Sequence, residues 1–316
     1  MSARLSKRAM QRAEREQDVP GARLSKRAGR RAEREQDVPT LTPWRGPGPG
    51  RPDLPLPPDP MPMLRGGRMR KRWRYVGVYA PEVMLCAARA EIGPFRQSFW
   101  AVWDREGRRR HAHTRVLPGG GEVTMDGPEV RVQGRDVAAE LHFGDAAPVE
   151  SLCPSGERGY GWTRKRAGVP VSGTIDAGGR RWRVQARGVD DESAGYHQRH
   201  TSWHWSAGVG RAADGQMVAW NLVSGINDPE ERSERGIWLG GVPHEPRPVS
   251  FSGLEAIEFA DGARLAFEAE SERARNDNLL VFRSRYRHRF GTFSGSLDGV
   301  ELGEGFGVME EHEAVW

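Results

Sequence analysis

Cysteine is scarce in this chain, and long apolar runs are absent. The 316 residues include two cysteines, Cys86 and Cys153, which are too few for a disulfide framework, so we expect buried free thiols. No window approaches the length of about eighteen apolar residues that a transmembrane helix needs. The first residues also lack the apolar core of a secretory signal. These absences predict a cytoplasmic protein without a transmembrane segment.

Helical periodicity is missing as well, whereas turn-forming and aromatic residues are abundant. The chain contains 40 glycines and 22 prolines, which favours frequent turns and few helices. It also contains 11 tryptophans, which is typical of aromatic-lined β structure rather than of a helical bundle. No segment alternates strands and helices as a parallel sheet would require.

The basic charge of the chain is concentrated at its N-terminal end. Residues 1–72 hold 18 of the 48 Lys and Arg but only 8 of the 43 Asp and Glu, so the remaining residues carry 30 basic and 35 acidic side chains. The formal net charge of +5 therefore comes from the N-terminal segment. Because the folded part shows no basic stripe and no recognisable nucleic-acid-binding motif, we expect no nucleic acid as its partner.

Residues 1–67 differ in composition from the rest of the chain. Residues 22–39 repeat residues 3–20 with sixteen of eighteen positions identical, and a proline-rich stretch follows at 40–67. High charge density and low hydrophobicity predict disorder for the repeat, and the functional alternative is a tether that contacts an anionic surface, either nucleic acid or an anionic membrane. The proline-rich stretch is typical of an extended linker, so the fold is predicted to begin near Arg68.

The remaining chain shows the pattern of many short antiparallel strands. Runs rich in β-branched and aromatic residues are separated by short polar gaps. Strong hairpin signals stand at Asp214-Gly215, Asp261-Gly262 and Asp298-Gly299. About twenty strands are too many for one small barrel, so we predict an all-β fold. Its two antiparallel barrels or sandwiches would lie in tandem, over residues 68–188 and 189–316.

The segment 195–228, GYHQRHTSWHWSAGVGRAADGQMVAWNLVSGIND, is the most informative part of the chain. Two-residue periodicity predicts a hairpin that carries Trp203, Trp205 and Trp220 on an apolar face and His204 on the other face. Asn221 lies in the middle of a predicted strand, where asparagine is uncommon. It is either a ligand-orienting amide in a pocket or a buried amide paired with neighbouring backbone.

Acidic residues flank this hairpin on both sides. Asp190 and Asp191 precede it, and Asn227 and Asp228 follow it. Paired carboxylates serve as general acid and base when burial separates their pKa values, and solvated ion pairs are the alternative interpretation. We select Tyr196, Trp203, Trp205, Trp220, Asn221, Asn227 and Asp228 as candidate ligand-binding residues, and Asp190, Asp191 and His204 as candidate catalytic residues.

Metal and cofactor chemistry find little support in the sequence. His197, His200 and His204 are the only histidines in the hairpin segment, and His197 and His200 would point to opposite faces of a strand. No cysteine lies nearby and no H-E-x-x-H pattern exists, which argues against zinc. The glycine-rich stretches lack the lysine of a phosphate-binding loop. We therefore expect no metal and no cofactor.

Several motifs carry a resemblance to a known family. The segments KRWRYVGVYAPEVMLCAARAEIG, SFWAVWDREG, HTSWHWSAGVGRAADGQMVAWNLVSGIND and GVMEEHEAVW occur in this order over residues 68–316. Together they resemble the Domain of Unknown Function 2804 family. The hairpin is more distantly similar to hydroxyneurosporene synthase (a carotenoid 1,2-hydratase) and to AttH-like proteins. This similarity implies two tandem lipocalin-like (calycin) barrels and an elongated apolar ligand.

Three functions follow as alternatives. The first is binding of a lipid or isoprenoid-like molecule in an aromatic barrel pocket. The second is a metal-independent hydratase or isomerase, in which the resemblance implies Asp190 or Asp191 as the acid and His204 and Asn221 as orienting groups. The third is a scaffold tethered by the basic N-terminal segment. A closed, tryptophan-lined cavity beside Asn221 would favour the first two.

Overall fold

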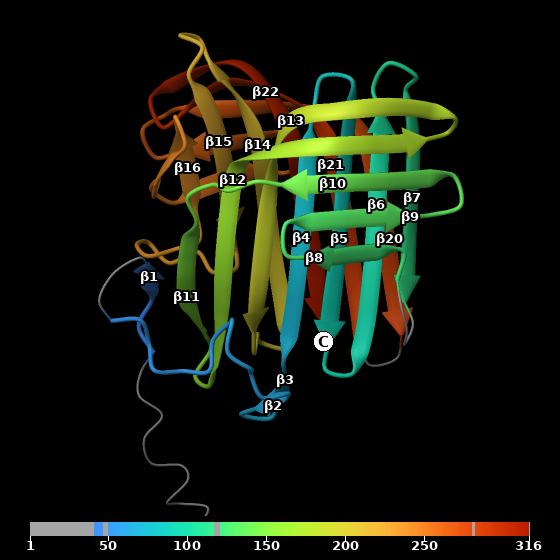
Figure 1. Ribbon diagram of the computed structural model, residues 1–316. Helices are drawn as coiled ribbons and strands as arrows, with labels where there is room; N and C mark the ends of the chain where they lie inside the picture. Colours follow the sequence, from blue (N-terminus) through green and yellow to red (C-terminus); the bar gives the residue numbers. More distant parts are fainter. Residues whose placement is uncertain (1–40, 47–49, 117–120, 280–281, 316) are drawn as a thin grey trace, which may run out of the picture. The chain divides into compact units, whose positions relative to one another are not determined.

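The computed structural model describes residues 41–46, 50–116, 121–279 and 282–315. By its contacts the chain divides into residues 1–41 and residues 42–316, and the second unit contains every strand (Figure 1). The prediction of an all-β fold is confirmed. No segment in the described ranges forms a helix with the length and hydropathy needed to cross a bilayer. The duplicated segment, its predicted disorder and its predicted contact with an anionic surface lie outside the described residues.

The strands form two large antiparallel sheets and one small hairpin. The first sheet contains β1 (Trp44–Gly46), β4 (Lys71–Tyr79), β5 (Val83–Ile92), β6 (Phe95–Asp104), β7 (Arg109–Val116), β8 (Val123–Asp126), β9 (Glu129–Gln133), β10 (Val137–Phe143), β11 (Val149–Ser155), β12 (Gly159–Ala177) and β13 (Arg180–Gly195). The second contains β14 (His200–Ala212), β15 (Met217–Ser224), β16 (Gly236–Leu239), β17 (Val242–His244), β18 (Val249–Ser252), β19 (Ala256–Phe259), β20 (Arg264–Leu279), β21 (Phe282–Leu297) and β22 (Val300–Val315). The small hairpin pairs β2 (Leu64–Arg65) with β3 (Arg68–Met69).

The two sheets repeat one topology. In the first, the main path runs β7-β6-β5-β4-β13-β12-β10-β9-β8, and in the second it runs β17-β16-β15-β14-β22-β21-β20-β19-β18. Each path consists of a four-strand meander whose first strand pairs with the last strand of a second meander. Both sheets are curled into half-barrels of lipocalin-like type, so the prediction of two tandem β units is confirmed.

Glycine sets the turns of three hairpins that the sequence predicted. Gly215, Gly262 and Gly299 have φ angles of 87°, 88° and 78°, which glycine adopts without a steric penalty. They join β14 to β15, β19 to β20 and β21 to β22, and each of these pairs is antiparallel. The Asp-Gly signals therefore fix the register of the strands that carry most of the site described below.

Three apolar clusters fill the space inside and between the sheets. One cluster contains only residues of the first sheet, including Val76, Leu85 and Trp100, and another contains only residues of the second, including Trp220 and Leu265. The third cluster joins the sheets, as when Tyr75 packs with Trp205. In Figure 1, β4–β7 stand in front of β20–β22, in agreement with this packing. The interior of each curled sheet is occupied by side chains.

The strands do not begin and end at residues 68 and 188, where the sequence placed the limits of the first unit. Residues before Arg68 belong to the packed structure, because β1 pairs with β11 and Leu56 is completely buried. A linker was expected there because proline signals extended backbone but does not reveal what that backbone packs against. Strand β13 continues through residue 188, and the chain changes sheet between Gly195 and His200. Cys86 and Cys153 are both buried and free, as expected.

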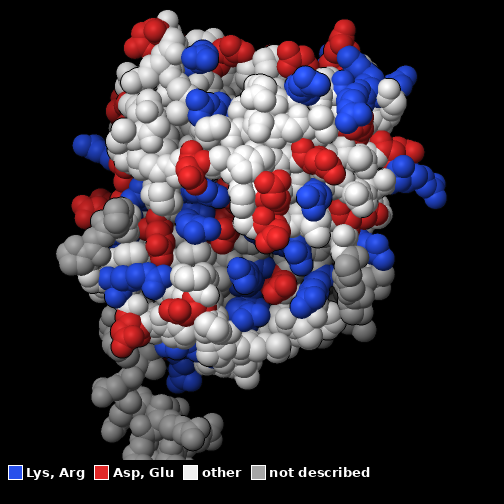
Figure 2. Space-filling view, viewed as in Figure 1, with Lys and Arg blue, Asp and Glu red and all other residues white. Residues whose placement is uncertain are grey.

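Charged side chains of both signs are interspersed on the surface seen in Figure 2. Many of them form ion pairs between different strands. Arg264 lies 2.9 Å from Glu258, and Arg180 lies 2.8 Å from Asp104. The face in Figure 2 therefore presents no broad field of a single sign of the kind that nucleic-acid-binding surfaces show.

Candidate functional site

A cavity of about 150 Å³ lies between the two sheets. Strands β4, β5, β6, β12 and β13 of the first sheet contribute to its wall, as do β14, β15, β20, β21 and β22 of the second. Its aromatic lining consists of Trp73, Tyr75, Phe99, Trp203, Trp205 and Tyr286. We had expected a pocket inside a barrel, but each curled sheet is filled by its own cluster, and this cavity lies where the sheets face each other.

Strand register builds one wall of the cavity from rows of side chains on the second sheet. Trp205 pairs with Glu310, Glu310 with His288, and His288 with Arg273, so these four residues form one row across β14, β22, β21 and β20. The next row on the same face, two residues along each strand, contains Trp203, His312, Tyr286 and Arg275.

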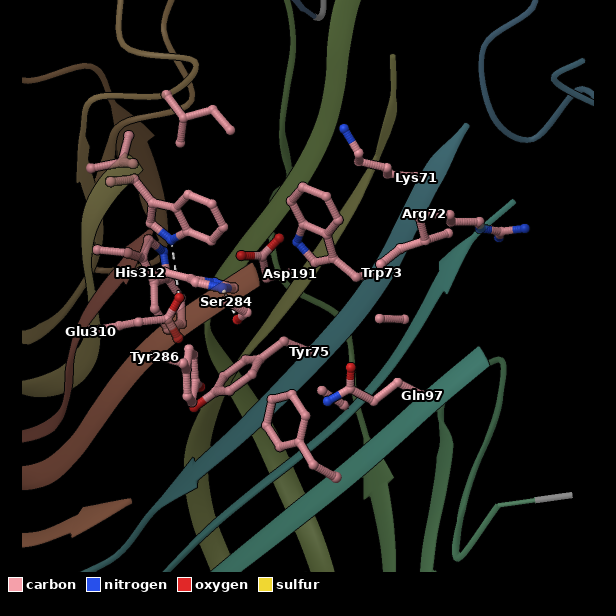
Figure 3. A pocket seen from close by; sticks show the side chains of 18 of the residues that line it. Lys71, Arg72, Trp73, Tyr75, Gln97, Asp191, Ser284, Tyr286, Glu310 and His312 are labelled. Atoms are coloured by element: carbon pink, nitrogen blue, oxygen red, sulfur yellow. Dashed lines mark hydrogen bonds between the residues drawn. The ribbon is translucent and has the colours of Figure 1, made fainter. Parts of the chain in front are cut away.

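A matching row on the first sheet forms the opposite wall. Register aligns Lys165, Asp191, Tyr75, Ala88, Phe99 and Thr114 across β12, β13, β4, β5, β6 and β7. The two rows touch, because the Tyr75 hydroxyl lies 3.1 Å from Nε2 of His288. In Figure 3, Tyr75 lies across from Tyr286, which belongs to the other sheet.

A buried charged group lies at one end of the cavity. The Nζ atom of Lys165 is 2.6 Å from Oδ1 of Asp191 and 3.3 Å from Oε1 of Glu234, and Asn227 donates a 3.0 Å hydrogen bond to Glu234. Burial raises the pKa of both carboxyls, and the charge of Lys165 opposes this shift. Burial alone would lower the pKa of Lys165, but the two carboxylates raise it. Lys165 therefore remains a cation shared by two acids.

Glu310 is a buried carboxyl with an unusual proton affinity. Burial raises its pKa to about 7, while a hydrogen bond from the indole of Trp203 lowers it and the charge of Asp191 raises it. The indole nitrogen donates to Oε1 at 3.0 Å, and this bond is dashed in Figure 3. At neutral pH a large fraction of Glu310 therefore carries a proton inside an aromatic cavity, which is the state that a general acid requires.

Two neutral histidines lie beside Glu310. Burial, together with the nearby charge of Arg273, lowers the pKa of His288 and of His312 to about 3. Nε2 of His312 is 2.8 Å from the Ser284 hydroxyl, which is the second dashed bond in Figure 3. Because these pKa values lie far below neutral pH, both imidazoles stay uncharged and take up a proton poorly, so their role in the wall is to orient a polar group.

Four of the residues selected from the sequence line the cavity, namely Asp191, Trp203, Trp205 and Asn227. Asn221 lies directly behind this wall and is 3 % exposed. Its side-chain oxygen accepts a 2.8 Å bond from the Trp205 indole, and its amide donates to the backbone oxygen of Glu234 at 3.0 Å. The structure thus places Asn221 as a paired buried amide that orients Trp205.

Asp190 and Trp220 lie away from the cavity. Asp190 accepts bonds of 3.0 and 2.9 Å from Arg74 and also pairs with Arg166, on the face of β13 opposite Asp191. Placing Trp220 on the face of Trp203 and Trp205 was wrong. Trp205 pairs with Val223, so Trp220 points into the core of the second sheet, where its indole bonds to Ser206 at 3.1 Å. Alternation within each strand was predicted correctly, but the pairing of β14 with β15 across the hairpin was misassigned by one residue.

The remaining selected residues have other surroundings. Tyr196 donates a 2.5 Å hydrogen bond to the backbone oxygen of Pro62 and so anchors the N-terminal segment. Asp228 accepts a 2.7 Å bond from the backbone amide of Gly225 in the turn after β15. His204 stacks on Phe251, at 5.6 Å between ring centroids.

The three histidines of the hairpin segment do not converge. His197 is buried, and Nε2 of His200 pairs with Glu313 at 3.1 Å on the surface. His204 lies on the other side of β14 from the cavity, against Phe251. Within the described ranges, no group of three His, Cys, Asp or Glu side chains is arranged as a metal site.

Sequence reasoning missed several residues of the cavity, including Lys165, Arg273, Glu310 and His312. A signal was present in GVMEEHEAVW, where Glu310 and His312 alternate with Met309 and Glu311. Two polar residues in succession on one face of a strand that also carries Val308 are unusual for a core strand. The other two residues lie in arginine-rich stretches that resemble solvent-exposed strand faces.

The model of the family described as Domain of unknown function (DUF2804) matches residues 123–316. The chain belongs to this family. The resemblance inferred from the sequence is therefore confirmed, although the match begins later than residue 68. No curated protein matched the sequence.

Solved structures show the same fold at low sequence identity. A kievitone hydratase from Nectria haematococca is 10 % identical, with 76 % of this chain and 88 % of that chain covered and a TM-score of 0.51. A protein described as AttH from Nitrosomonas europaea is 13 % identical, with 81 % and 98 % covered and a TM-score of 0.47. The similarity to the kievitone hydratase structure shows a shared fold and nothing beyond it.

Proposed function

We propose that this protein binds a compact apolar molecule, isoprenoid-like or aromatic, between its two sheets. The observation that carries the proposal is the cavity of about 150 Å³ lined by six aromatic side chains. A cavity of this size accommodates a benzene-sized group when its lining is apolar. Polar groups that converge on the wall, among them Glu310 and His312, would orient such a ligand, as in most small-molecule sites.

Filling the cavity should abolish this binding. Ala90 lines the cavity, and the variant Ala90→Phe places a ring in the space that a ligand would occupy. Geraniol, a short isoprenoid alcohol, is expected to change the tryptophan fluorescence of the wild-type protein, because Trp73, Trp203 and Trp205 line the site. We expect Ala90→Phe to weaken geraniol binding by more than about tenfold.

The matched control is Ala112→Phe, which adds the same ring on the exposed face of β7. This variant should bind geraniol like the wild-type protein. Equal weakening by both variants would contradict a site at Ala90. Absence of geraniol binding, together with absence of any apolar molecule in native mass spectra of protein purified from its source, would overturn the proposed function.

A second candidate is a hydratase that acts on the bound molecule, and Glu310 is the observation that favours it. The fold occurs in a protein named kievitone hydratase, but a shared fold alone does not transfer an activity. In the proposed step, the Glu310 carboxyl donates its proton to one carbon of a C=C bond. Water adds to the cation left on the other carbon, and the proton that this water loses returns to the Glu310 carboxylate.

The surroundings of Glu310 suit such a step. Aromatic rings stabilise a cation, and Trp203 and Tyr286 line the cavity with the neutral imidazole of His312 beside them. If the step occurs, wild-type protein incubated with geraniol in water labelled with oxygen-18 should form a labelled tertiary alcohol, which mass spectrometry detects. If geraniol binds and no label is incorporated above the protein-free control, the catalytic candidate fails and the binding function stands.

A further inference from the structure

Arg273 is a buried cation that lacks a carboxylate partner. It lies on β20, lines the cavity and is 8 % exposed. Its Nη2 atom donates a 2.6 Å hydrogen bond to the hydroxyl of Thr114, whereas Nη1 is buried without a hydrogen-bond partner. Among the described residues, no Asp or Glu oxygen lies within ion-pair distance of its guanidinium.

Three other buried or half-buried cations in or beside the two sheets do have such partners. Lys165 lies between two carboxylates, and Arg105 lies 2.5 Å from Glu270. Arg275, two residues along the same face of β20, lies 2.6 Å from Asp277. Because an unpaired buried charge is costly, the absence of a carboxylate partner at Arg273 needs an explanation.

Aromatic rings hold Arg273 in place but do not neutralise it. Its guanidinium carbon lies 4.3 Å from the ring centre of Phe99 and 5.1 Å from that of Tyr286. Such contacts compensate part of the lost hydration and leave the formal charge unmatched. Glu310 belongs to the same row of side chains and the charge of Arg273 lowers its pKa, but His288 stands between the two residues and they form no ion pair.

We propose that Arg273 binds an anionic oxygen of the ligand, of carboxylate type, so that the ligand is an amphipathic acid. The inference rests on the proposed function, because it assigns a headgroup to the apolar molecule that occupies the cavity. The body of the molecule lies against Trp73 and Trp205, and the acidic group reaches the unpartnered side of the guanidinium. The other end of the cavity holds two acids, Asp191 and Glu234, against one cation, which disfavours a ligand anion there and orients the molecule.

The test compares geranic acid, its methyl ester and geraniol, which share one apolar body, by tryptophan fluorescence at neutral pH. The wild-type protein should bind geranic acid about tenfold more tightly than the two neutral compounds. Arg273→Met should remove this preference and leave the affinity for geraniol within about twofold. Arg273→Lys should retain part of the preference, because it keeps the charge but loses the planar geometry.

Arg264→Met is the control, because it removes another arginine of β20 that has a carboxylate partner but lies outside the cavity. The preference for the acid should survive in this variant. Equal affinities for all three compounds in the wild-type protein would overturn the proposal that the ligand has an acidic headgroup, and would leave the proposal of apolar binding intact. This comparison uses the wild-type protein alone, so it does not depend on the folding of any variant. A preference that persists in a folded Arg273→Met protein would overturn the role of Arg273. If none of the compounds binds, the proposed function itself fails.

Discussion

Replacing Lys165 by methionine is expected to destabilise the protein by about 3–5 kcal/mol at neutral pH, the range found when one partner of a buried ion pair is removed. The side chains of Lys165, Asp191 and Glu234 are 4 %, 9 % and 3 % exposed. Without the ammonium group, two buried carboxyls would face each other, with a single amide, Asn227, left to bond to Glu234. The measurement is the free energy of unfolding from a urea titration.

Two further variants separate the charge effect from a packing effect. Arg164→Met removes the neighbouring cation, whose side chain is 42 % exposed and pairs with Glu192, and should cost less than about 1 kcal/mol. Adding Asp191→Asn and Glu234→Gln to Lys165→Met should recover much of the loss, because neutral amides remove the uncompensated charge. If Lys165→Met were as stable as Arg164→Met, the charge of Lys165 would not be needed to stabilise the two buried carboxyls.

The same group shows what the sequence could and could not reveal about the site. The sequence reasoning placed Asp190 and Asp191 in a loop or strand entry, whereas both lie within β13, on opposite faces of the strand. Which face meets the second sheet depends on how both sheets curl, and no local pattern encodes this. Asp191 lies at the cavity beside Lys165, whereas Asp190 is held by Arg74 and Arg166 on the other side.

The fold itself was more accessible to prediction than the cavity. Hairpins such as β14–β15 follow from local signals, because Asp214-Gly215 selects the turn and alternation selects the faces. The cavity instead joins Tyr75 to His288, which are separated by 213 positions in the chain. The composition of a short sequence segment cannot reveal a contact between residues so far apart in the chain. Inspection of the hairpin segment therefore identified Trp203 and Trp205 but missed Glu310, their neighbour on β22.

Replacing Glu310 by glutamine is expected to change how stability depends on pH. Burial raises the pKa of Glu310 from the ordinary value of 4.5 to about 7. Between these values the folded state binds one proton more than the unfolded state, so this carboxyl makes stability fall as pH rises. The shift corresponds to about 3 kcal/mol, at about 1.4 kcal/mol per unit. Glu310→Gln cannot ionise and should lack this loss.

The measurement is the free energy of unfolding of both proteins at several values between pH 4.5 and 8. The variant should gain about 3 kcal/mol relative to wild type across this range. Glu311→Gln is the control, because Glu311 is the next residue on β22 and its side chain is 45 % exposed. Parallel curves for wild type and Glu310→Gln would show that the Glu310 carboxyl does not keep its proton on folding.

The same variant decides whether that proton has a chemical use. If Glu310 is the acid of a hydration step, wild-type activity should decline above about pH 7, as the carboxyl ionises, and Glu310→Gln should lose activity by about 10²–10⁴-fold. Glutamine keeps the size of the side chain and can still interact with the Trp203 indole, so geraniol binding should change little. Retained activity would remove Glu310 from the reaction, whereas lost binding would make it a ligand-orienting residue instead. The pH profile separates these roles, since a residue that only shapes the cavity would not make turnover follow the protonation of one carboxyl.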